Sequence, residues 1–395
     1  MEITKDIKYV GVNDHEIDLF EGHYIVPEGM AYNSYLICDE KTVVMDSVDE
    51  HFTDEWIGKI KNELGNKEPD YIIIQHMEPD HSGSLKLFMD EFKTATVVAS
   101  QKAFTMMANF FEGDCFEDRQ LVVKEGDTLE LGAHTLSFIA APMVHWPEVI
   151  MTYDAKDKVL FSADAFGRFG ALDMIGETVK EDDDWACEAR RYYFGIVGKY
   201  GAQAQAVLKK AANLDIEQIC SLHGPVINED LGYYLGLYDT WSKYESESQG
   251  VVIAYTSVYG HTKKAVEMLA EKLEKAGVPR VEVTDLARDD MAEAVEDAFR
   301  HDTVVFATTT FNNDVFPYMR EFIHSLVERN FQNKRVAFIE NGSWAPQAGK
   351  VMKSMLEACK NLTCCENEVH IVSALNDESR AQLDALASEL AAAYK

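Results

Sequence analysis

Short apolar or alternating runs, separated by Gly-marked turns, dominate the first half of the chain. They predict β-strands at residues 23–26, 34–37, 41–45, 71–75, 121–123, 128–131, 134–140, 149–153 and 159–162. Several of the later runs alternate apolar and polar residues, as strands with one solvated face do. Helical periodicity is found near residues 54–64 and 84–92, and more strongly over 184–213. This pattern favours an α/β sandwich over a parallel doubly wound sheet.

The second half follows a different pattern. Apolar or β-rich runs at residues 251–257, 281–285, 303–308, 336–340 and 368–372 alternate with helical segments near 262–276, 291–298, 318–329, 348–361 and 378–393. Regular alternation of strand and helix predicts an open parallel sheet with helices on both faces. A polar, small-residue stretch at 244–250 is typical of a linker. We therefore predict two domains, residues 1–248 and 249–395.

Composition excludes several classes of protein. The chain has 395 residues, more than one hydrophobic core usually organises. Its net charge of −31 argues against a nucleic-acid or anionic-membrane surface, since both require clustered Lys and Arg. No apolar stretch is long enough to span a membrane, and the first residues lack a signal-peptide pattern. Seven cysteines without C-x-x-C spacing fit a reducing cytoplasm and exclude a C-x-x-C iron module.

The segment from residue 72 to 84 carries the strongest chemical signal. An apolar run ends in four potential metal ligands, His76, Glu78, Asp80 and His81. Two imidazoles and two carboxylates within six residues are costly to bury without a cation, because each charge loses its hydration. Imidazole mixed with hard oxygen donors suits iron or manganese as well as zinc. The segment therefore predicts half of a metal site.

Three further candidates, His145, Asp164 and His223, follow other predicted strands. Taken singly, each has a simpler interpretation: a hydrogen-bonded structural histidine for the two imidazoles, or a turn cap for the aspartate. Taken together, all seven occupy the same kind of position at a strand end. Four histidines and three carboxylates approach the donor number of two five- or six-coordinate metals, and three negative charges largely offset two divalent ions.

These residues carry a family resemblance. The segment is similar to the H-x-H-x-D-H motif of metallo-β-lactamase-fold hydrolases, with Glu78 where the second histidine stands. With His145-Trp-Pro, Asp164-Ala-Phe-Gly and His223-Gly, it resembles the flavodiiron proteins, or A-type flavoproteins. The resemblance implies a metallo-β-lactamase-like αββα sandwich in the first domain. Carried over, it assigns one iron to His76, Glu78 and His145, the other to Asp80, His81 and His223, and a bridge to Asp164. In some members the residue matching His81 does not ligate.

Three loops of the second half predict a cofactor site. The first, residues 256–262, contains hydroxyl side chains and a glycine and lies between a predicted strand and a predicted helix. Loops of this kind bind anions through backbone N–H groups. This one has neither a G-x-G-x-x-G nor a Walker pattern. A monophosphate is therefore favoured over a pyrophosphate. Two more polar loops with an aromatic residue follow later strands, at the edge where open α/β sheets bind ligands. The ordered set resembles the FMN loops of flavodoxins, although Tyr259-Gly-His-Thr262 departs from the commonest T-x-T-G-N-T pattern. It implies FMN-binding residues Thr256, Ser257, Val258, Tyr259, Gly260, His261, Thr262, Thr308, Thr309, Thr310, Phe311, Asn312, Asn313, Asn341, Gly342, Ser343 and Trp344.

The resemblance implies a cytoplasmic FMN- and diiron-dependent reductase of dioxygen to water, of nitric oxide to nitrous oxide, or both. It also implies a head-to-tail homodimer or a dimer of dimers, with Trp344 where one chain's flavin meets the partner's irons. An external donor, a rubredoxin-like protein or a reduced deazaflavin coenzyme, would supply electrons. Substrate preference is expected to lie in groups around the ligands. Tyr192, Tyr193 and His23 are candidates, although an ordinary core or surface role is the favoured interpretation of each.

Two other functions are compatible with the same residues. One is a metallo-β-lactamase-type di-zinc hydrolase with a regulatory flavodoxin-like domain, against which Glu78 counts because a harder anionic donor favours ferric iron. The other is a non-enzymatic electron carrier or flavin sensor whose metal site is structural.

Overall fold

The computed structural model describes residues 1–180 and 185–395, which divide into two compact units, Met1–Asp239 and Thr240–Lys395. The division falls within helix α8 (Leu231–Ser242), ahead of the predicted boundary after residue 248. The stretch predicted as a linker instead belongs to the second unit. Glu247 N donates to Arg300 O, and strand β16 begins at Ser248, so backbone bonds hold this segment in place. No helix in the described residues combines the length and apolar character needed to cross a membrane.

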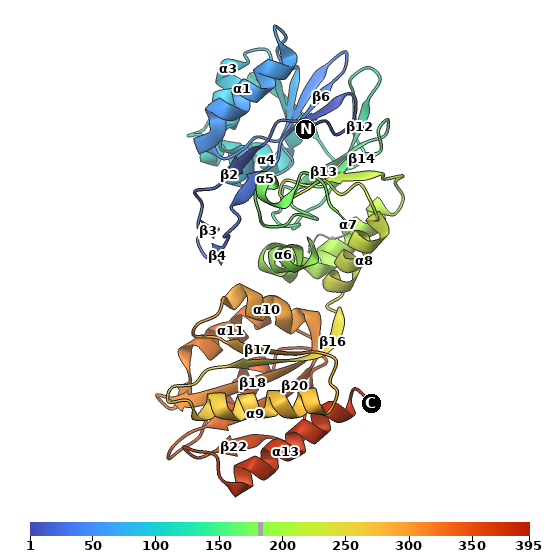
Figure 1. The fold of residues 1–395 in the computed structure, drawn as a ribbon. Helices are drawn as coiled ribbons and strands as arrows, with labels where there is room; N and C mark the ends of the chain where they lie inside the picture. Colours follow the sequence, from blue (N-terminus) through green and yellow to red (C-terminus); the bar gives the residue numbers. More distant parts are fainter. Residues whose placement is uncertain (181–184) are drawn as a thin grey trace. The chain divides into compact units, whose positions relative to one another are not determined.

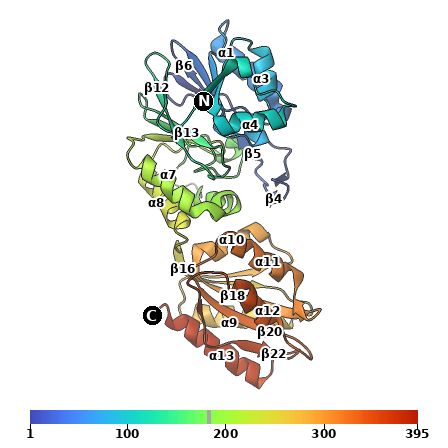
Figure 2. The ribbon, with the colours of Figure 1, turned by 180° about the vertical axis from the view of Figure 1, so that it is seen from behind.

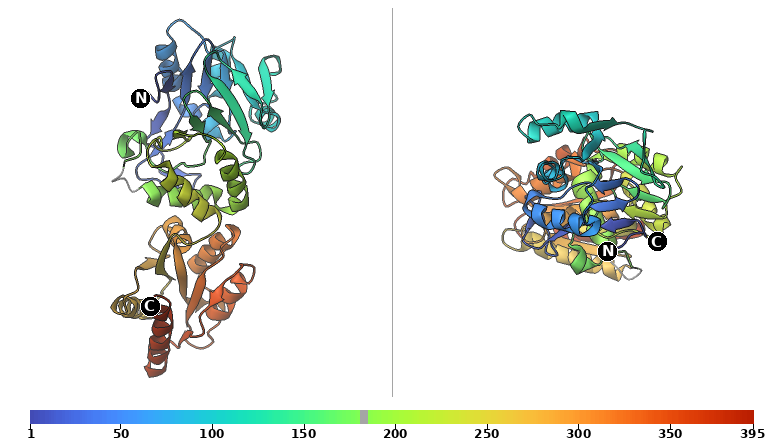
Figure 3. Two further views of the ribbon diagram at one scale, coloured as in Figure 1. Left: turned by 90° about the vertical axis from the view of Figure 1, so that its right-hand side faces the viewer. Right: turned by 90° about the horizontal axis from the view of Figure 1, so that it is seen from above.

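The first unit contains two sheets packed face to face (Figure 1; Figure 3). One has the order β1-β6-β7-β8-β9-β10: Ile7–Tyr9, Tyr35–Cys38, Thr42–Met45, Tyr71–Ile73, Thr96–Ser100 and Gln120–Val123. The other has the order β11-β12-β13-β14-β15: Thr128–Glu130, Thr135–Ala140, Ile150–Asp154, Val159–Phe161 and Gln218–Cys220. Inward side chains such as Ile73 and Phe161 form one continuous core between the sheets. Two small ribbons, β2 (Val12–Asp14) with β5 (Met30–Tyr32) and β3 (Leu19–Phe20) with β4 (Tyr24–Ile25), complete the strands of this unit.

One helix of the first unit shows how an apolar stripe holds a helix against a sheet. In α1 (Thr53–Leu64), Trp56, Ile60 and Leu64 recur every four residues and are buried, as an amphipathic helix on a sheet requires. Trp56 Nε1 also donates to Ser34 Oγ at 2.9 Å, which ties the helix to the first sheet. The remaining helices described here are α2 (Pro79–Ser82), α3 (Leu85–Glu91), α4 (Gln101–Phe110), α5 (Leu172–Ile175), α6 (Trp185–Tyr192) and α7 (Gly201–Ala211).

The long helix predicted over 184–213 is not continuous, and its first residue lies outside the described part of the chain. α6 passes at Tyr193–Val197 into a π-helical turn and then a 3-10 turn, Gly198–Tyr200, before α7 begins. Gly195 explains part of the break, because a Cβ there would lie 2.9 Å from the Tyr24 ring. Irregular turns of this kind are frequent at functional sites, and this one follows Tyr192 directly.

The second unit is the predicted open sheet. Parallel strands run in the order β17-β16-β18-β20-β21, namely Val281–Asp285, Ser248–Tyr255, His301–Phe311, Arg335–Asn341 and Thr363–Cys364; β22 (Val369–Ile371) also pairs with β20. Helices α9 (His261–Lys275) and α13 (Asp377–Ala392) pack on one face (Figure 1). Helices α10 (Met291–Arg300), α11 (Pro317–Glu328) and α12 (Ala348–Leu356) cover the other (Figure 2). A hairpin, β18 with β19 (Asp314–Val315), projects beyond the carboxyl edge.

Candidate metal centre and cofactor pocket

All seven predicted metal ligands meet at one edge of the sandwich. The 76–81 segment follows β8, while Asp164 and His223 follow β14 and β15, which run parallel. His145 stands in the loop between β12 and β13, and because β13 is antiparallel to β14, that loop reaches the same edge. Gly224 permits the turn after His223: its φ is +76°, and a Cβ there would lie 2.6 Å from Arg168 Cγ. Topology therefore brings together residues far apart in sequence.

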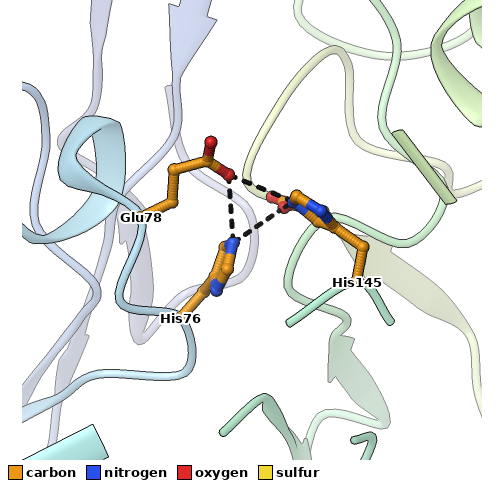
Figure 4. A group of neighbouring side chains, drawn as sticks. His76, Glu78 and His145 are labelled. Atoms are coloured by element: carbon orange, nitrogen blue, oxygen red, sulfur yellow. Dashed lines mark hydrogen bonds and ion pairs between the residues drawn. The ribbon is translucent and has the colours of Figure 1, made fainter. Parts of the chain in front are cut away.

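His76, Glu78, His145 and Asp164 form one group (Figure 4 shows the first three pointing toward one another). Glu78 Oε2 lies 3.2 Å from His76 Nε2 and 3.1 Å from His145 Nε2. Asp164 Oδ2 lies 3.3 Å and 3.0 Å from the same two nitrogens. Every one of these side chains is mostly or wholly buried.

Asp80, His81 and His223 form a second group, and Asp164 contacts it as well. Asp80 Oδ2 lies 3.3 Å from the Nε2 atom of each histidine. Asp164 Oδ1, its other carboxylate oxygen, lies 3.2 Å from His81 Nε2 and 3.9 Å from His223 Nε2. Asp164 therefore stands between the groups with one oxygen toward each, which is the arrangement of a bridging carboxylate.

The spacing of these donor atoms fits metal ligation. Metal–nitrogen bonds of about 2.1 Å place two ligand atoms about 3.0 Å apart at right angles and about 3.4 Å apart at tetrahedral angles. Both carboxylate oxygens of Asp80 and of Asp164 are buried without a hydrogen-bond partner among the described residues. Buried carboxylates are rarely left so. Their lone pairs, together with the imidazole nitrogens, are suited to two cations.

The negative charge of these carboxylates is offset by protons on the neighbouring imidazoles. Burial opposes the charged form of His145, but Asp164 and Glu78 outweigh it and raise its pKa to about 9. Burial likewise opposes charge on His76, yet Asp164 holds its pKa well above the ordinary value. Although burial favours the neutral acid, the neighbouring histidines hold the pKa of Asp164 well below its usual range. A metal ion binding here must displace protons from the imidazoles.

Two buried carboxylates that support the site were missed in the sequence. Glu148 Oε1 accepts hydrogen bonds from His76 Nδ1 at 2.8 Å and from Met77 N at 2.9 Å. Asp46 accepts from Gln75 N at 2.7 Å and from its side-chain Nε2 at 2.9 Å, and burial raises the pKa of Asp46 to about 6. Histidine ligands usually donate their second N–H to such a partner, so a carboxylate three residues from His145 was a usable signal.

The three residues considered as determinants of substrate preference lie in different places. Tyr192 is buried with its ring centroid 5.5 Å from that of His223, and its hydroxyl has no hydrogen-bond partner among the described residues. Burial, together with the charges of Asp164 and Asp80, raises its pKa well above the usual value, so the hydroxyl keeps its proton. Tyr193 packs on Tyr238 instead, with ring centroids 5.0 Å apart. His23 is exposed and lies against Tyr24.

A cavity of about 600 Å³ opens at the carboxyl edge of the second unit's sheet. Its volume is typical of small-molecule and cofactor sites. All three predicted loops line it, and so do two residues missed in the sequence, Ala345 and Ser373. Ser373 follows β22, so the expectation that ligands bind at the carboxyl ends of the strands would have identified this residue too. Trp344 and Tyr259 are 92% and 91% exposed at the cavity.

Side-chain bonds shape these loops. Ser257 Oγ accepts from Gly260 N at 3.1 Å and Lys263 N at 3.2 Å, which folds the first loop onto the start of α9. Gly260 has a φ of +87°, where a residue without Cβ is favoured. Three predicted residues do not line the cavity. Besides Gly260 these are Thr256 and Thr308, whose hydroxyls bond each other at 2.6 Å in the buried layer beneath.

Comparison with known proteins finds two family models along the chain. The model described as ODP family beta lactamase matches residues 30–224, and a flavodoxin domain model matches residues 252–367. An uncharacterized protein of Methanocaldococcus jannaschii is 32% identical over 82% of this chain and 80% of its own. The anaerobic nitric oxide reductase flavorubredoxin of Escherichia coli is 29% identical over 90% of this chain and 74% of its own.

Two solved structures are similar to this chain in fold over nearly its whole length. Rubredoxin oxygen:oxidoreductase from Desulfovibrio gigas has a TM-score of 0.90 at 26% identity, covering 100% of this chain and 98% of that one. The flavodiiron protein from Giardia intestinalis has the same TM-score and identity, covering 100% and 97%. These findings confirm both predicted fold classes, a metallo-β-lactamase-like first unit and a flavodoxin-like second unit.

Proposed function

The chain belongs to the flavodiiron protein family of oxidoreductases, and from that premise we propose that it reduces dioxygen to water, nitric oxide to nitrous oxide, or both. The reaction would take place at two irons, with electrons relayed through FMN.

One observation carries this proposal: two groups of buried ligand atoms share Asp164. His76, Glu78 and His145 would hold one iron, and Asp80, His81 and His223 the other. A single-metal site has no use for a second complete group. A purely structural site has no need to leave both oxygens of Asp80 and Asp164 without a hydrogen-bond partner among the described residues. The donor set also selects the metal. Glu78 and Asp80 give each group an anionic oxygen donor, which favours iron over a soft-ligand zinc site.

When bound, the iron pair supplies the redox change and open coordination positions for the gas, and FMN supplies electrons one at a time. The chain's own residues hold and shield these groups. Asp164 and the two other carboxylates offset the positive charge, so that little net charge is buried. Tyr192 keeps a protonated hydroxyl beside His223, where it can donate a hydrogen bond to the gas. This role accords with the lack of any protein partner for that hydroxyl among the described residues.

Residues of the 600 Å³ cavity would hold FMN. The first loop and the start of α9 suit the phosphate, because backbone N–H groups at a helix start attract anions. Trp344, Tyr259 and Phe311 are aromatic side chains at the same cavity, able to cover a flat ring system.

The electrons would reach the flavin from a donor molecule. A rubredoxin-like protein or a reduced deazaflavin coenzyme is the proposed donor, and the name of the Desulfovibrio gigas enzyme supports the first. We further propose a head-to-tail homodimer, or a dimer of dimers, in which the partner chain covers the cavity mouth. The exposure of Trp344 and Tyr259 supports this arrangement, because large apolar surfaces commonly mark interfaces.

The proposal is tested by supplying each gas separately to the full chain, loaded with iron and FMN and photoreduced without oxygen. Electrodes for dioxygen and nitric oxide follow consumption in parallel. We expect catalytic consumption of at least one gas, and its loss in Asp164→Ala with flavin retained. A loaded wild-type protein that consumes neither gas contradicts the proposed function, and unchanged turnover in Asp164→Ala assigns the chemistry to the flavin.

A further inference from the structure

Glu148 is a buried carboxylate that belongs to neither ligand group. It lies in the loop between β12 and β13, and its side chain and that of His76 are both fully buried. Among the described residues, His76 is its only ion-pair partner, at 2.8 Å. Its second oxygen, Oε2, is buried with no hydrogen-bond partner among those residues. A carboxylate in such surroundings is costly unless a positive charge lies close by.

The contact fixes which nitrogen of His76 carries a proton. Glu148 Oε1 also accepts from Met77 N at 2.9 Å, so this oxygen is held in place by the backbone of the ligand segment itself. A carboxylate oxygen accepts only, so His76 Nδ1 must donate. Nε2 is then the nitrogen that faces Glu78 and Asp164, and it can ligate a metal once its own proton is displaced.

Among the described residues, no carboxylate accepts a hydrogen bond from the second ring nitrogen of either histidine in the other group. The buried Asp46, whose charge acts on His81, accepts from Gln75 instead. His223 Nδ1 donates to the neutral carbonyl of Ala31 at 2.7 Å. His81 Nδ1 is buried without a hydrogen-bond partner among the described residues. Each group has one carboxylate of its own, Glu78 or Asp80, and both share Asp164. The two groups therefore have matching sets of candidate ligands. They differ in the residues that accept hydrogen bonds from the second ring nitrogens of their histidines.

We propose that Glu148 is a positioning residue that makes the two metal positions unequal. The position at His76, Glu78 and His145 binds its divalent metal more tightly and, when that metal is iron, has the lower reduction potential. An anionic acceptor behind His76 makes its imidazole a stronger donor and stabilises the more highly charged ion. The inference rests on the proposed function only for the identity of the metal as iron. The difference between the contacts of His76 and those of His81 and His223 does not depend on which metal binds.

Two measurements on the full chain test this inference without either gas. The metal-free protein is titrated with Fe(II) under anaerobic conditions, and the loaded protein is then titrated potentiometrically, each iron losing one electron to the mediator. We expect two binding steps and two separated potentials in the wild type. In Glu148→Gln we expect the tighter step to weaken by about 10- to 100-fold and the lower potential to rise, with the other step and potential little changed.

Glu148→Gln keeps a side-chain oxygen that can accept from His76 and removes only the negative charge. A shift in reduction potential in this variant is therefore caused by the lost charge and not by altered packing. Asp154→Asn is the matched control. It removes a charge from another fully buried carboxylate–histidine pair, Asp154 with His134 at 2.9 Å, outside the cluster. Unchanged binding and potentials in Glu148→Gln, or equal shifts in the control, would overturn the inference. Should the variant fail to fold, identical affinities and potentials at both positions of the wild type would also overturn it.

Discussion

The Nε2 atoms of His81 and His223 lie 3.0 Å apart, although the residues are separated by 142 positions in the chain. Two imidazole lone pairs at this distance repel each other unless a proton or a cation lies between them. Two nitrogens bound at right angles to one metal, with bonds of about 2.1 Å, lie about 3.0 Å apart. The separation therefore supports His81 as a ligand in this chain.

If His81 is a ligand, His81→Ala should lower the metal content from two ions per chain to one. The group formed by His76, Glu78 and His145 keeps its donors, whereas Asp80 and His223 alone bind weakly. Elemental analysis after anaerobic loading and desalting measures this directly. His324→Ala, an exposed histidine on α11, is the matched control. Two metals retained in His81→Ala would exclude ligation by His81.

Metal affinity should rise with pH up to about 9. The neighbouring carboxylates raise the pKa of His145 to about 9, and the pKa values of His76 and His81 are raised as well. Below pH 9 the metal must displace at least one proton, and above it the imidazole of His145 is already neutral. Each displaced proton weakens binding about tenfold per pH unit of acidification. Competition with a chelator at several pH values checks this, and a flat profile would show that the histidines do not ligate.

Tyr192→Phe should change the preference between the two gases and leave the metal content unaltered. The phenolic hydroxyl is buried beside His223 and stays protonated, so its loss removes a hydrogen-bond donor without a change of charge. A lost hydrogen bond of about 1.4 kcal/mol corresponds to about a tenfold change in kcat/KM for the gas that accepts it. Parallel assays with both gases give the ratio. Tyr193→Phe, whose ring packs on Tyr238, serves as the control. An unchanged ratio in Tyr192→Phe would place substrate selection elsewhere.

Ser257→Ala should weaken FMN binding and spare the metals. Ser257 Oγ accepts from Gly260 N and Lys263 N, so its loss leaves the phosphate loop without the bonds that hold its shape. A net loss of about 1 to 1.5 kcal/mol lowers FMN affinity by roughly tenfold. Quenching of flavin fluorescence on binding gives the dissociation constant. Ser388→Ala on α13, where the hydroxyl donates to Asp384 O of the same helix, is the matched control. Equal affinity in the two variants would contradict the phosphate assignment.

The candidate ligand cluster was predictable because each member follows the end of a strand within a few residues. Parallel pairing of β14 with β15 and the antiparallel pairing of β13 with β14 bring Asp164, His223 and His145 to one edge. His145, Asp164 and His223 needed no knowledge of the packing, only the recurrence of that position. Glu148 was hidden for the opposite reason. It stands in a loop without regular structure, where its spacing of three residues from His145 marks a candidate supporting carboxylate but does not determine that its side chain turns inward.

Other misses have local causes. The helical periodicity of 184–213 is real, but glycines at 195 and 198 and close packing against Tyr24 interrupt the regular turns. The stretch at 244–250 looks like a linker by composition, yet backbone pairing with Arg300 and the start of β16 decide its structure. Thr256 and Thr308 fit the polar pattern of the flavin loops but bond each other beneath the cavity. In each case tertiary contacts decide a position that local pattern leaves open.

The metal content of protein purified without oxygen tests the central claim most directly, when read together with its flavin content. We propose that Glu78 and the shared Asp164 make the cluster a site for two irons, in the same chain as a cavity suited to FMN. We expect two irons and one FMN per chain. Two zincs without iron, in a protein that hydrolyses metallo-β-lactamase-type substrates, would contradict the account.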